Sequence, residues 1–153
     1  MKLYRIHRKQ RLSLSVDAAW TFFSNPWNLQ KITPPWLDFY IANEVYKAMY
    51  PGMLIMYRLK TLYGIPTIWI SEITQVAEPH FFVDQMRFGP YRFWHHQHHF
   101  KTVSGGVEVQ DIVHYAMKFG IFGQLFNHMM VSSKLEEIFN FRKNTLEQLF
   151  NDL

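Results

Sequence analysis

Alternation of apolar and polar residues dominates the first three quarters of the chain. Residues 3–15 end in a strict alternation around Leu12 and Leu14, and this period of two predicts a β-strand. Between residues 36 and 115, runs rich in β-branched and aromatic side chains alternate with turn signals such as Ser104-Gly105-Gly106. The predicted strands there are Phe39–Val45, Met53–Leu62, Ile65–Val76, Phe81–Phe88, Tyr91–Val103 and Val107–Tyr115, with a turn at Tyr63-Gly64. Because short turns join them, these strands predict a meandering antiparallel sheet.

Two short helices are predicted between the first strand and the others. Ser15 and Asp17 are both suitable N-caps for the first of them. Asn25-Pro26 ends this helix, and residues 27–32 form a second one. The following Thr33-Pro34-Pro35 excludes a helix interior, since proline lacks the backbone N–H and clashes with the preceding turn.

The C-terminal part of the chain changes to a helical period. From about Gly123 to Phe150 there is no proline and no further glycine. Apolar residues recur there at helical spacing, namely Leu125, Met129, Leu135, Ile138, Phe139, Leu146 and Leu149. A helix of about 25 residues would be about 38 Å long, and its apolar stripe must be buried against one face of the sheet. We therefore predict a single α+β domain over residues 1–153, in which the C-terminal helix packs on one face of a curved antiparallel sheet of about seven strands.

Composition supports a large core and excludes several classes of site. The 153 residues include 14 Phe, 8 Tyr and 5 Trp, and 48% are hydrophobic, whereas disordered chains are poor in aromatic residues. The chain has no cysteine, which excludes disulfides, a thiolate nucleophile and cysteine-ligated zinc or iron–sulfur clusters. It also lacks a phosphate-binding glycine loop, a nucleotide fingerprint and the nucleophilic-serine motif. We therefore expect no cofactor.

The net charge of +4 comes from the beginning of the chain. Five of the 16 Lys and Arg residues lie within residues 1–11, which contain no acid, and this leaves 11 cations and 12 acids in the remainder. This distribution does not favour nucleic-acid binding. It is typical of a solvated strand whose charges discourage edge pairing, or of contact with an acidic partner or anionic lipid. Because no apolar run is long enough for a membrane span or forms a secretory leader, we expect a cytoplasmic protein without membrane insertion.

Residues 95–99, with the sequence His-His-Gln-His-His, form the most distinctive local pattern. Side chains alternate along a strand, so His96 and His98 share one face. Asp84 and Asp111 lie on the two neighbouring predicted strands. If the register places them opposite the histidines, the four residues form one polar cluster.

Three uses of such a cluster are open at this point. The two histidines could hold one metal ion, with Asp84 or Asp111 as third ligand, if both ring nitrogens lie about 2.0–2.1 Å from it. His96 or His98 could act as an acid–base group, since histidine titrates near neutrality. The third use is ordinary hydrogen bonding that adds polarity to a cavity wall. This last use is the commonest for histidine pairs on strands, so we expect no metal and assign no catalytic residue, with His96 and His98 as the only candidates.

Several short motifs are spread over the whole chain. They are Ile32-Thr33-Pro34-Pro35-Trp36, Gly64-Ile65-Pro66 with Trp69, Asp84 before Gly89-Pro90-Tyr91, the alternating set Trp94, His96, His98 and Phe100, Asp111 with Tyr115, and Ile138-Phe139 with Phe141-Arg142. Together with the order of elements, they resemble the START, polyketide-cyclase and birch-pollen-allergen superfamily, whose fold is called helix-grip. More closely, the chain resembles a bacterial family within it that is described as ligand-binding SRPBCC proteins. One departure is Met86, which stands where the family pattern has glutamine.

The resemblance implies that the sheet wraps around the C-terminal helix and leaves a cavity between them that holds mostly apolar molecules. The expected function is non-enzymatic binding of a small hydrophobic or amphipathic ligand. The candidate ligand-binding residues are Trp69, Phe82, Asp84, Trp94, His96, His98, Asp111, Tyr115, Met129, Met130 and Phe139. One alternative is a cyclase or dehydratase that acts on an aromatic or polyketide-like substrate, with His96 or His98 as acid–base group. The other is an interaction module with a protein partner or a weak homodimer.

Overall fold

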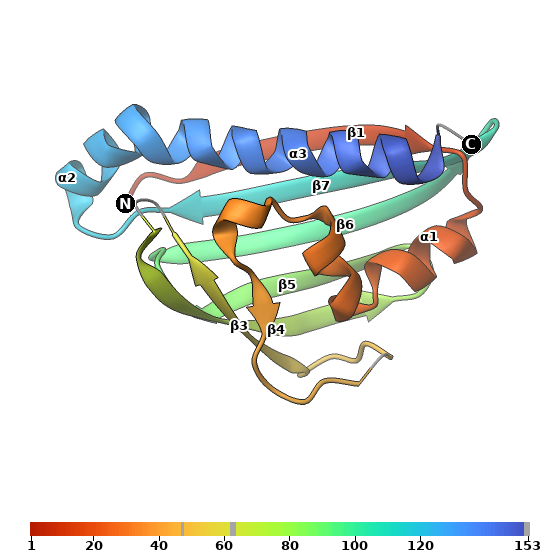
Figure 1. Cartoon of the computed structure of the whole chain (residues 1–153), viewed down its shortest axis with the longest axis horizontal. Coiled ribbons are helices and arrows are strands. Elements are labelled where there is room, and N and C mark those ends of the chain that lie inside the picture. Colours follow the sequence, from red (N-terminus) through yellow and green to blue (C-terminus); the bar gives the residue numbers. More distant parts are fainter. Residues whose placement is uncertain (47, 62–63, 152–153) are drawn as a thin grey trace.

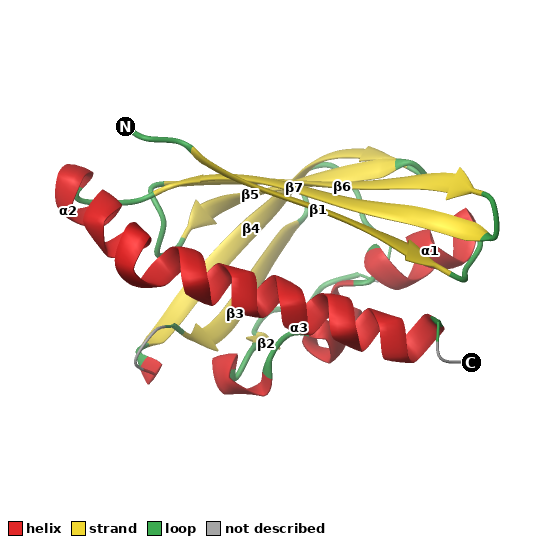
Figure 2. Ribbon diagram, turned by 90° about the horizontal axis from the view of Figure 1, so that it is seen from above, coloured by secondary structure: helices red, strands yellow, loops and turns green. Residues whose placement is uncertain are grey.

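A seven-stranded antiparallel sheet curves around a long C-terminal helix in the computed structural model, which describes residues 1–46, 48–61 and 64–151 (Figures 1 and 2). The strands are β1 (Tyr4–Leu12), β2 (Tyr40–Ile41), β3 (Leu54–Lys60), β4 (Pro66–Ala77), β5 (Phe81–Phe88), β6 (Phe93–Val103) and β7 (Gly106–Ala116). Their order in the sheet is β1-β7-β6-β5-β4-β3-β2. The predicted helix-grip α+β fold is thereby confirmed. The predicted strand end at Leu62 and the turn residue Tyr63 lie outside the described residues.

The segment between β1 and β2 holds short helices, as predicted. Helix α1 (Val16–Phe23) begins after Ser15, whose hydroxyl accepts a hydrogen bond from the Ala18 N–H at 3.1 Å. A 3-10 helix, η1 (Pro26–Ile32), follows it. The expected proline break holds a further 3-10 turn, η2 (Pro35–Leu37). This turn is compatible with the sequence because Pro35 occupies its first position, where no backbone donor is needed.

Strand β2 is much shorter than the predicted strand over residues 39–45. The side chain of Asn43 explains the difference, because it takes over the pairing that a longer strand would make. Its amide nitrogen donates to the Leu54 carbonyl at 3.1 Å, and its oxygen accepts from the Met56 N–H at 2.8 Å. The edge of the sheet therefore ends in side-chain hydrogen bonds instead of a backbone ladder.

The predicted C-terminal helix is interrupted. Helix α2 (Gly120–Phe126) passes through a π-helical turn (Asn127–Val131) into α3 (Ser132–Phe150). A π turn holds more residues than an α turn, so the apolar stripe loses its phase there. Leu135, Phe139 and Leu146, which follow the turn, are buried, whereas Leu125 and Met129, before and within it, are exposed. Leu149, near the end of α3, is exposed as well. For the three exposed residues the predicted burial was wrong.

One end of the space between α3 and the sheet is filled by side chains. Trp20 of α1 packs edge-on against Phe82 and Phe100, with ring centroids 5.8 and 5.9 Å apart. Leu12 and Leu146 belong to the same buried cluster. This packing closes the sheet at the α1 end and leaves the other end for a cavity. No helix in the described ranges combines the length and the apolar character that crossing a membrane would need.

Candidate functional site

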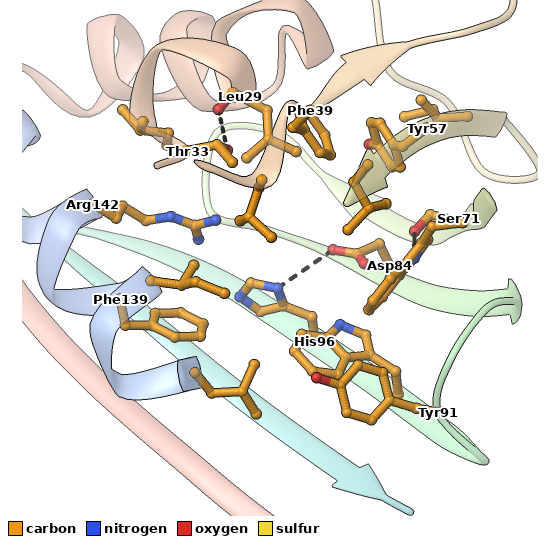
Figure 3. A pocket seen from close by; sticks show the side chains of 18 of the residues that line it. Leu29, Thr33, Phe39, Tyr57, Ser71, Asp84, Tyr91, His96, Phe139 and Arg142 are labelled. Atoms are coloured by element: carbon orange, nitrogen blue, oxygen red, sulfur yellow. Dashed lines mark hydrogen bonds and ion pairs between the residues drawn. The ribbon is translucent and has the colours of Figure 1, made fainter. Parts of the chain in front are cut away.

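A cavity of about 380 Å³ lies between α3, the short helices and the concave face of the sheet (Figure 3). Its wall is mostly apolar and aromatic and includes Leu29, Phe39, Trp69, Trp94, Leu135 and Phe139. Cavities that hold small molecules in proteins commonly enclose about 300–1,000 Å³ with a few polar groups on an apolar wall. The size and lining of this cavity therefore suit a small, largely apolar molecule.

The polar part of the wall is built by three adjacent strands. Asp84 lies on β5, His96 and His98 lie on β6, and Asp111 lies on β7. The register places Asp84 opposite His96 and His98 opposite Asp111. The short hydrogen bonds nevertheless run diagonally: His96 Nε2 donates to Asp111 Oδ1 at 2.8 Å, and His98 Nε2 donates to Asp84 Oδ2 at 2.7 Å. The predicted cluster therefore forms, and each carboxylate holds the imidazole diagonal to it.

The two imidazole rings stack on one another, with centroids 3.7 Å apart and planes inclined by 29°. His98 Nδ1 also lies 3.3 Å from Asp111 Oδ1, and His96 Nδ1 lies 3.8 Å from Asp84 Oδ2. Each carboxylate thus faces both rings, and the four side chains form one compact unit, which we call the His–Asp cluster.

Arg142, on α3, places a guanidinium cation beside the His–Asp cluster. Its Nη1 lies 3.9 Å from Asp111 Oδ1, and its guanidinium carbon lies 5.1 Å from the centre of the Phe139 ring. Its Nε is buried and has no hydrogen-bond partner among the described residues. Figure 3 shows Arg142 reaching from α3 toward the space that Asp84 and His96 face. A buried donor without a partner is costly, and the side chain of Arg142 that carries it lines the cavity.

Burial opposes ionisation of both carboxyl groups, but the neighbouring donors outweigh it. The hydrogen bond from His98 and the charges of His96, His98 and Arg142 lower the pKa of Asp84. Hydrogen bonds from both imidazoles and the same cationic surroundings hold the pKa of Asp111 well below its ordinary value. Both residues are therefore carboxylates at neutral pH.

The pKa values of the two histidines are shifted in opposite directions. Burial and the charge of His98 lower the pKa of His96. Burial also disfavours the charged form of His98, yet its hydrogen bonds to Asp111 and Asp84 outweigh this effect and raise its pKa. His98 is therefore the imidazole that carries the proton. With Arg142, two cations balance two carboxylates, and the His–Asp cluster with Arg142 is close to neutral.

This assignment predicts a pH dependence of stability. In the unfolded chain a histidine has a pKa of about 6.5, and the folded value for His98 is higher. The contribution of His98 to stability is therefore complete below about pH 6.5 and is lost as the pH rises through the folded pKa. We expect the free energy of unfolding, measured with urea at several pH values, to fall on the alkaline side of this point. His98→Gln should remove that slope, whereas His80→Gln, in the exposed turn before β5, should keep it.

A shared metal ion suits this arrangement less well than hydrogen bonding does. Asp84, His96 and His98 offer ligand atoms that lie within 4.8 Å of one another. Stacked rings, however, direct their nitrogen lone pairs along nearly parallel lines, whereas a single ion requires them to converge at about 2.0–2.1 Å. The geometry therefore favours the hydrogen-bonded cluster, and the absence of a metal stays a prediction.

Seven of the candidate ligand-binding residues line the cavity: Trp69, Phe82, Asp84, Trp94, His96, His98 and Phe139. The other four are not among its described lining residues. Asp111 contacts the imidazoles, and the Tyr115 hydroxyl donates to Asn127 Oδ1 at 2.9 Å. Met129 is 67% exposed and Met130 is partly buried. Tyr115 and the two methionines therefore lie outside the described lining, whereas Asp111 supports the polar wall from behind through its contacts with the lining imidazoles.

The structure adds polar lining residues that the sequence analysis did not single out for ligand binding. Tyr57, Ser71, Tyr91 and Arg142 all face the cavity. The hydroxyl of Ser71 accepts a hydrogen bond from Trp69 Nε1 at 3.0 Å, so it orients that ring. For Arg142 a signal exists in the sequence, since it stands between Phe139 and Leu146 on the buried stripe of the helix. A lone cation on such a stripe indicates a buried partner.

Comparison with known proteins extends to the fold alone. Protein Ms6760 from Mycobacterium smegmatis matches with a TM-score of 0.68 and 16% identity over 97% of this chain and 96% of its own. Ginseng major latex-like protein 151 from Panax ginseng matches with a TM-score of 0.69 and 12% identity over 95% of this chain and 96% of its own. Ara h 8.0201 matches with a TM-score of 0.66 and 12% identity over 96% of this chain and 99% of its own. Neither a protein-family model nor a curated protein sequence matches the chain. The chain thus has the fold of these proteins, which supports the superfamily resemblance at that level, while the bacterial subfamily stays a prediction.

Proposed function

We propose that this protein binds a small amphipathic molecule in the cavity between the sheet and α3. The observation that carries the proposal is the combination of an apolar cavity of about 380 Å³ with one polar wall, the His–Asp cluster and Arg142. Apolar contacts supply most of the affinity in such sites, and a few polar groups fix the orientation. The ligand's apolar body therefore lies against the aromatic wall, and its polar end faces Arg142.

The polar end is a hydrogen-bond acceptor. The guanidinium of Arg142 lines the cavity, and its Nε–H has no partner in the described part of the chain. The cluster around it is already close to neutral. A carbonyl, hydroxyl or acidic oxygen accepts from the guanidinium of Arg142 without breaking the diagonal bonds between histidines and carboxylates. Ligands that lack an oxygen leave the donor unpaired, and we expect them to bind more weakly.

Native mass spectrometry of freshly purified protein tests the proposal first. An excess mass of a few hundred daltons that disappears on denaturation supports a resident ligand, and extraction then identifies it. If the mass is that of the bare chain, titration with anilinonaphthalene sulfonate, read from the probe's fluorescence, shows whether the cavity accepts an amphipathic molecule. Absence of both a resident ligand and saturable probe binding argues against the proposal.

Two leucines of α3 offer a matched pair for locating the binding site. Leu135 lines the cavity, whereas Leu146 is 2% exposed and packs in the closed core beside Trp20. Leu146→Phe should cost about 1–3 kcal/mol of stability because it overpacks a filled region. Leu135→Phe extends into open space, so it should cost less and should weaken binding of the probe. Urea unfolding and probe titration measure the two effects, and equal probe affinity in both variants would contradict binding in this cavity.

A second function, acid–base catalysis, is favoured by the state of His96. The Nε2–H of His96 donates to Asp111, and the pKa of His96 is lowered. The carboxylate oxygen nearest to His96 Nδ1, Asp84 Oδ2, is 3.8 Å away. A neutral imidazole oriented by a carboxylate is the arrangement that a general base needs. Exchange of the α-protons of β-tetralone in heavy water, followed by proton NMR, tests this function. The same exchange rate with wild-type protein and with His96→Gln argues against it.

A further inference from the structure

Helix α2 exposes the side chains that a helix of a soluble domain normally buries. Phe119, Ile121 and Phe122 are 82%, 77% and 79% exposed, and Leu125 and Met129 continue the exposed stripe at intervals of four residues. The opposite side of the segment buries Gly123 and Asn127. Gly123 is required there, because a Cβ would lie 1.8 Å from the Lys118 carbonyl oxygen. The glycine and asparagine thus fix α2 in an orientation that turns its apolar side outward, and we call this surface the α2 patch.

The chain around the α2 patch is cationic. Strand pairing brings the start of β1 beside the end of β7, where Tyr4 stacks on Tyr115, and Figures 1 and 2 place the N-terminus at the same end of the molecule as α2. The turn before β6 joins them, since Lys118 Nζ donates to the Gly89 carbonyl at 2.7 Å. The parts of these segments that lie at this end, residues 1–7, 86–95 and 113–130, contain no Asp or Glu.

The cations at this end include Lys2, Arg92 and Lys118. The first acids along α3, Glu136 and Glu137, already pair with Arg8 and Lys134. Within the part of the chain that the structure describes, none of the three cations forms an ion pair with an acid. A surface that combines exposed aromatic and aliphatic side chains with such cations is complementary to the interface of an anionic bilayer.

The same segment forms part of the cavity wall. Met117, Phe126 and Val131 line the cavity from the inside, and Phe126 is also 40% exposed. A surface bound to α2 therefore lies next to the cavity wall.

We propose that the α2 patch docks on anionic lipid bilayers, with its apolar side chains among the upper acyl chains and the neighbouring cations at the headgroup phosphates. A second copy of the chain fits this surface less well, because two α2 patches face to face would bring like charges together. Docking does not require the proposed ligand, so the two proposals are tested separately.

Co-sedimentation with vesicles tests the docking. We expect the wild-type protein to pellet with phosphatidylcholine vesicles that contain about 30% phosphatidylglycerol, and to be released by about 0.5 M NaCl, because salt screens the attraction. The double variant Ile121→Gln/Phe122→Gln should bind at least about tenfold more weakly, since it removes two exposed anchors. Leu54→Gln, which alters another exposed apolar side chain at the start of β3, should bind like the wild type.

Three outcomes would overturn the proposal. They are no pelleting of the wild-type protein with anionic vesicles, equal binding by the double variant, and a dimer in sedimentation velocity that the double variant abolishes while vesicle binding is absent. Because Ile121 and Phe122 are not among the described residues that line the cavity, probe fluorescence in the double variant should stay unchanged. This readout shows that the variant is folded and separates failure of docking from failure of ligand binding.

Discussion

Asp111→Asn should destabilise the protein by about 3–5 kcal/mol, the usual cost of removing one partner from a buried charge pair. Asp111 accepts a hydrogen bond from His96, faces the protonated His98 at 3.3 Å and lies 3.9 Å from Arg142. An amide of the same shape cannot balance these cations. It also presents an NH2 group to imidazole donors. Two buried positive groups would then share the single carboxylate of Asp84.

Urea unfolding at neutral pH measures this effect, and Asp38→Asn provides the matched control. The Asp38 carboxylate is 65% exposed and lies 3.5 Å from Lys60, so its loss should cost no more than about 1 kcal/mol. Asparagine also tolerates the left-handed backbone conformation of residue 38 (φ of 45°). If Asp111→Asn costs as little as Asp38→Asn, then the His–Asp cluster is not the charge-paired unit described above.

The sheet could be predicted closely because its signals are local. Strand β5 has the predicted ends, Phe81 and Phe88, since turn residues stand on both sides of it. Alternation along β6 placed His96 and His98 on one face, and the antiparallel register then brought Asp84 and Asp111 beside them. Each of these inferences needs only the period of a strand and the identity of its neighbour.

The helix side of the cavity could not be predicted in the same way. Five residues from Asn127 to Val131 form a π turn, and nothing in their spacing distinguishes them from an α-helix. This one irregularity turned Leu125 and Met129 to the surface. The diagonal choice of hydrogen bonds in the His–Asp cluster depends on ring stacking and on side-chain rotamers, which sequence alone does not determine. The role of Arg142 required both the helix phase and its position over the sheet.

Arg142→Met should change ligand selectivity much more than stability. The nearest contact that Arg142 makes with Asp111 is 3.9 Å long, and its Nε has no partner in residues 1–46, 48–61 and 64–151. Methionine has a similar length and adapts to apolar surroundings. The carboxylates lose one balancing charge, which His96 can replace by taking up a proton. We therefore expect a smaller loss of stability than for Asp111→Asn, because the Asp111 carboxylate contacts both imidazoles.

Two probes that differ in one group isolate the role of Arg142 in binding. Anilinonaphthalene sulfonate carries an anionic oxygen group, and phenylnaphthylamine has the same aromatic body without it. A hydrogen bond to a charged group contributes about 1.5–3 kcal/mol, so Arg142→Met should bind the sulfonate at least about tenfold more weakly and the neutral amine nearly unchanged. Lys143→Met, at the adjacent exposed position of α3, should bind both probes as the wild type does. Equal losses for the two probes would mean that Arg142 shapes the cavity without contacting the polar end of the ligand, and no loss for either would mean that the polar end binds elsewhere.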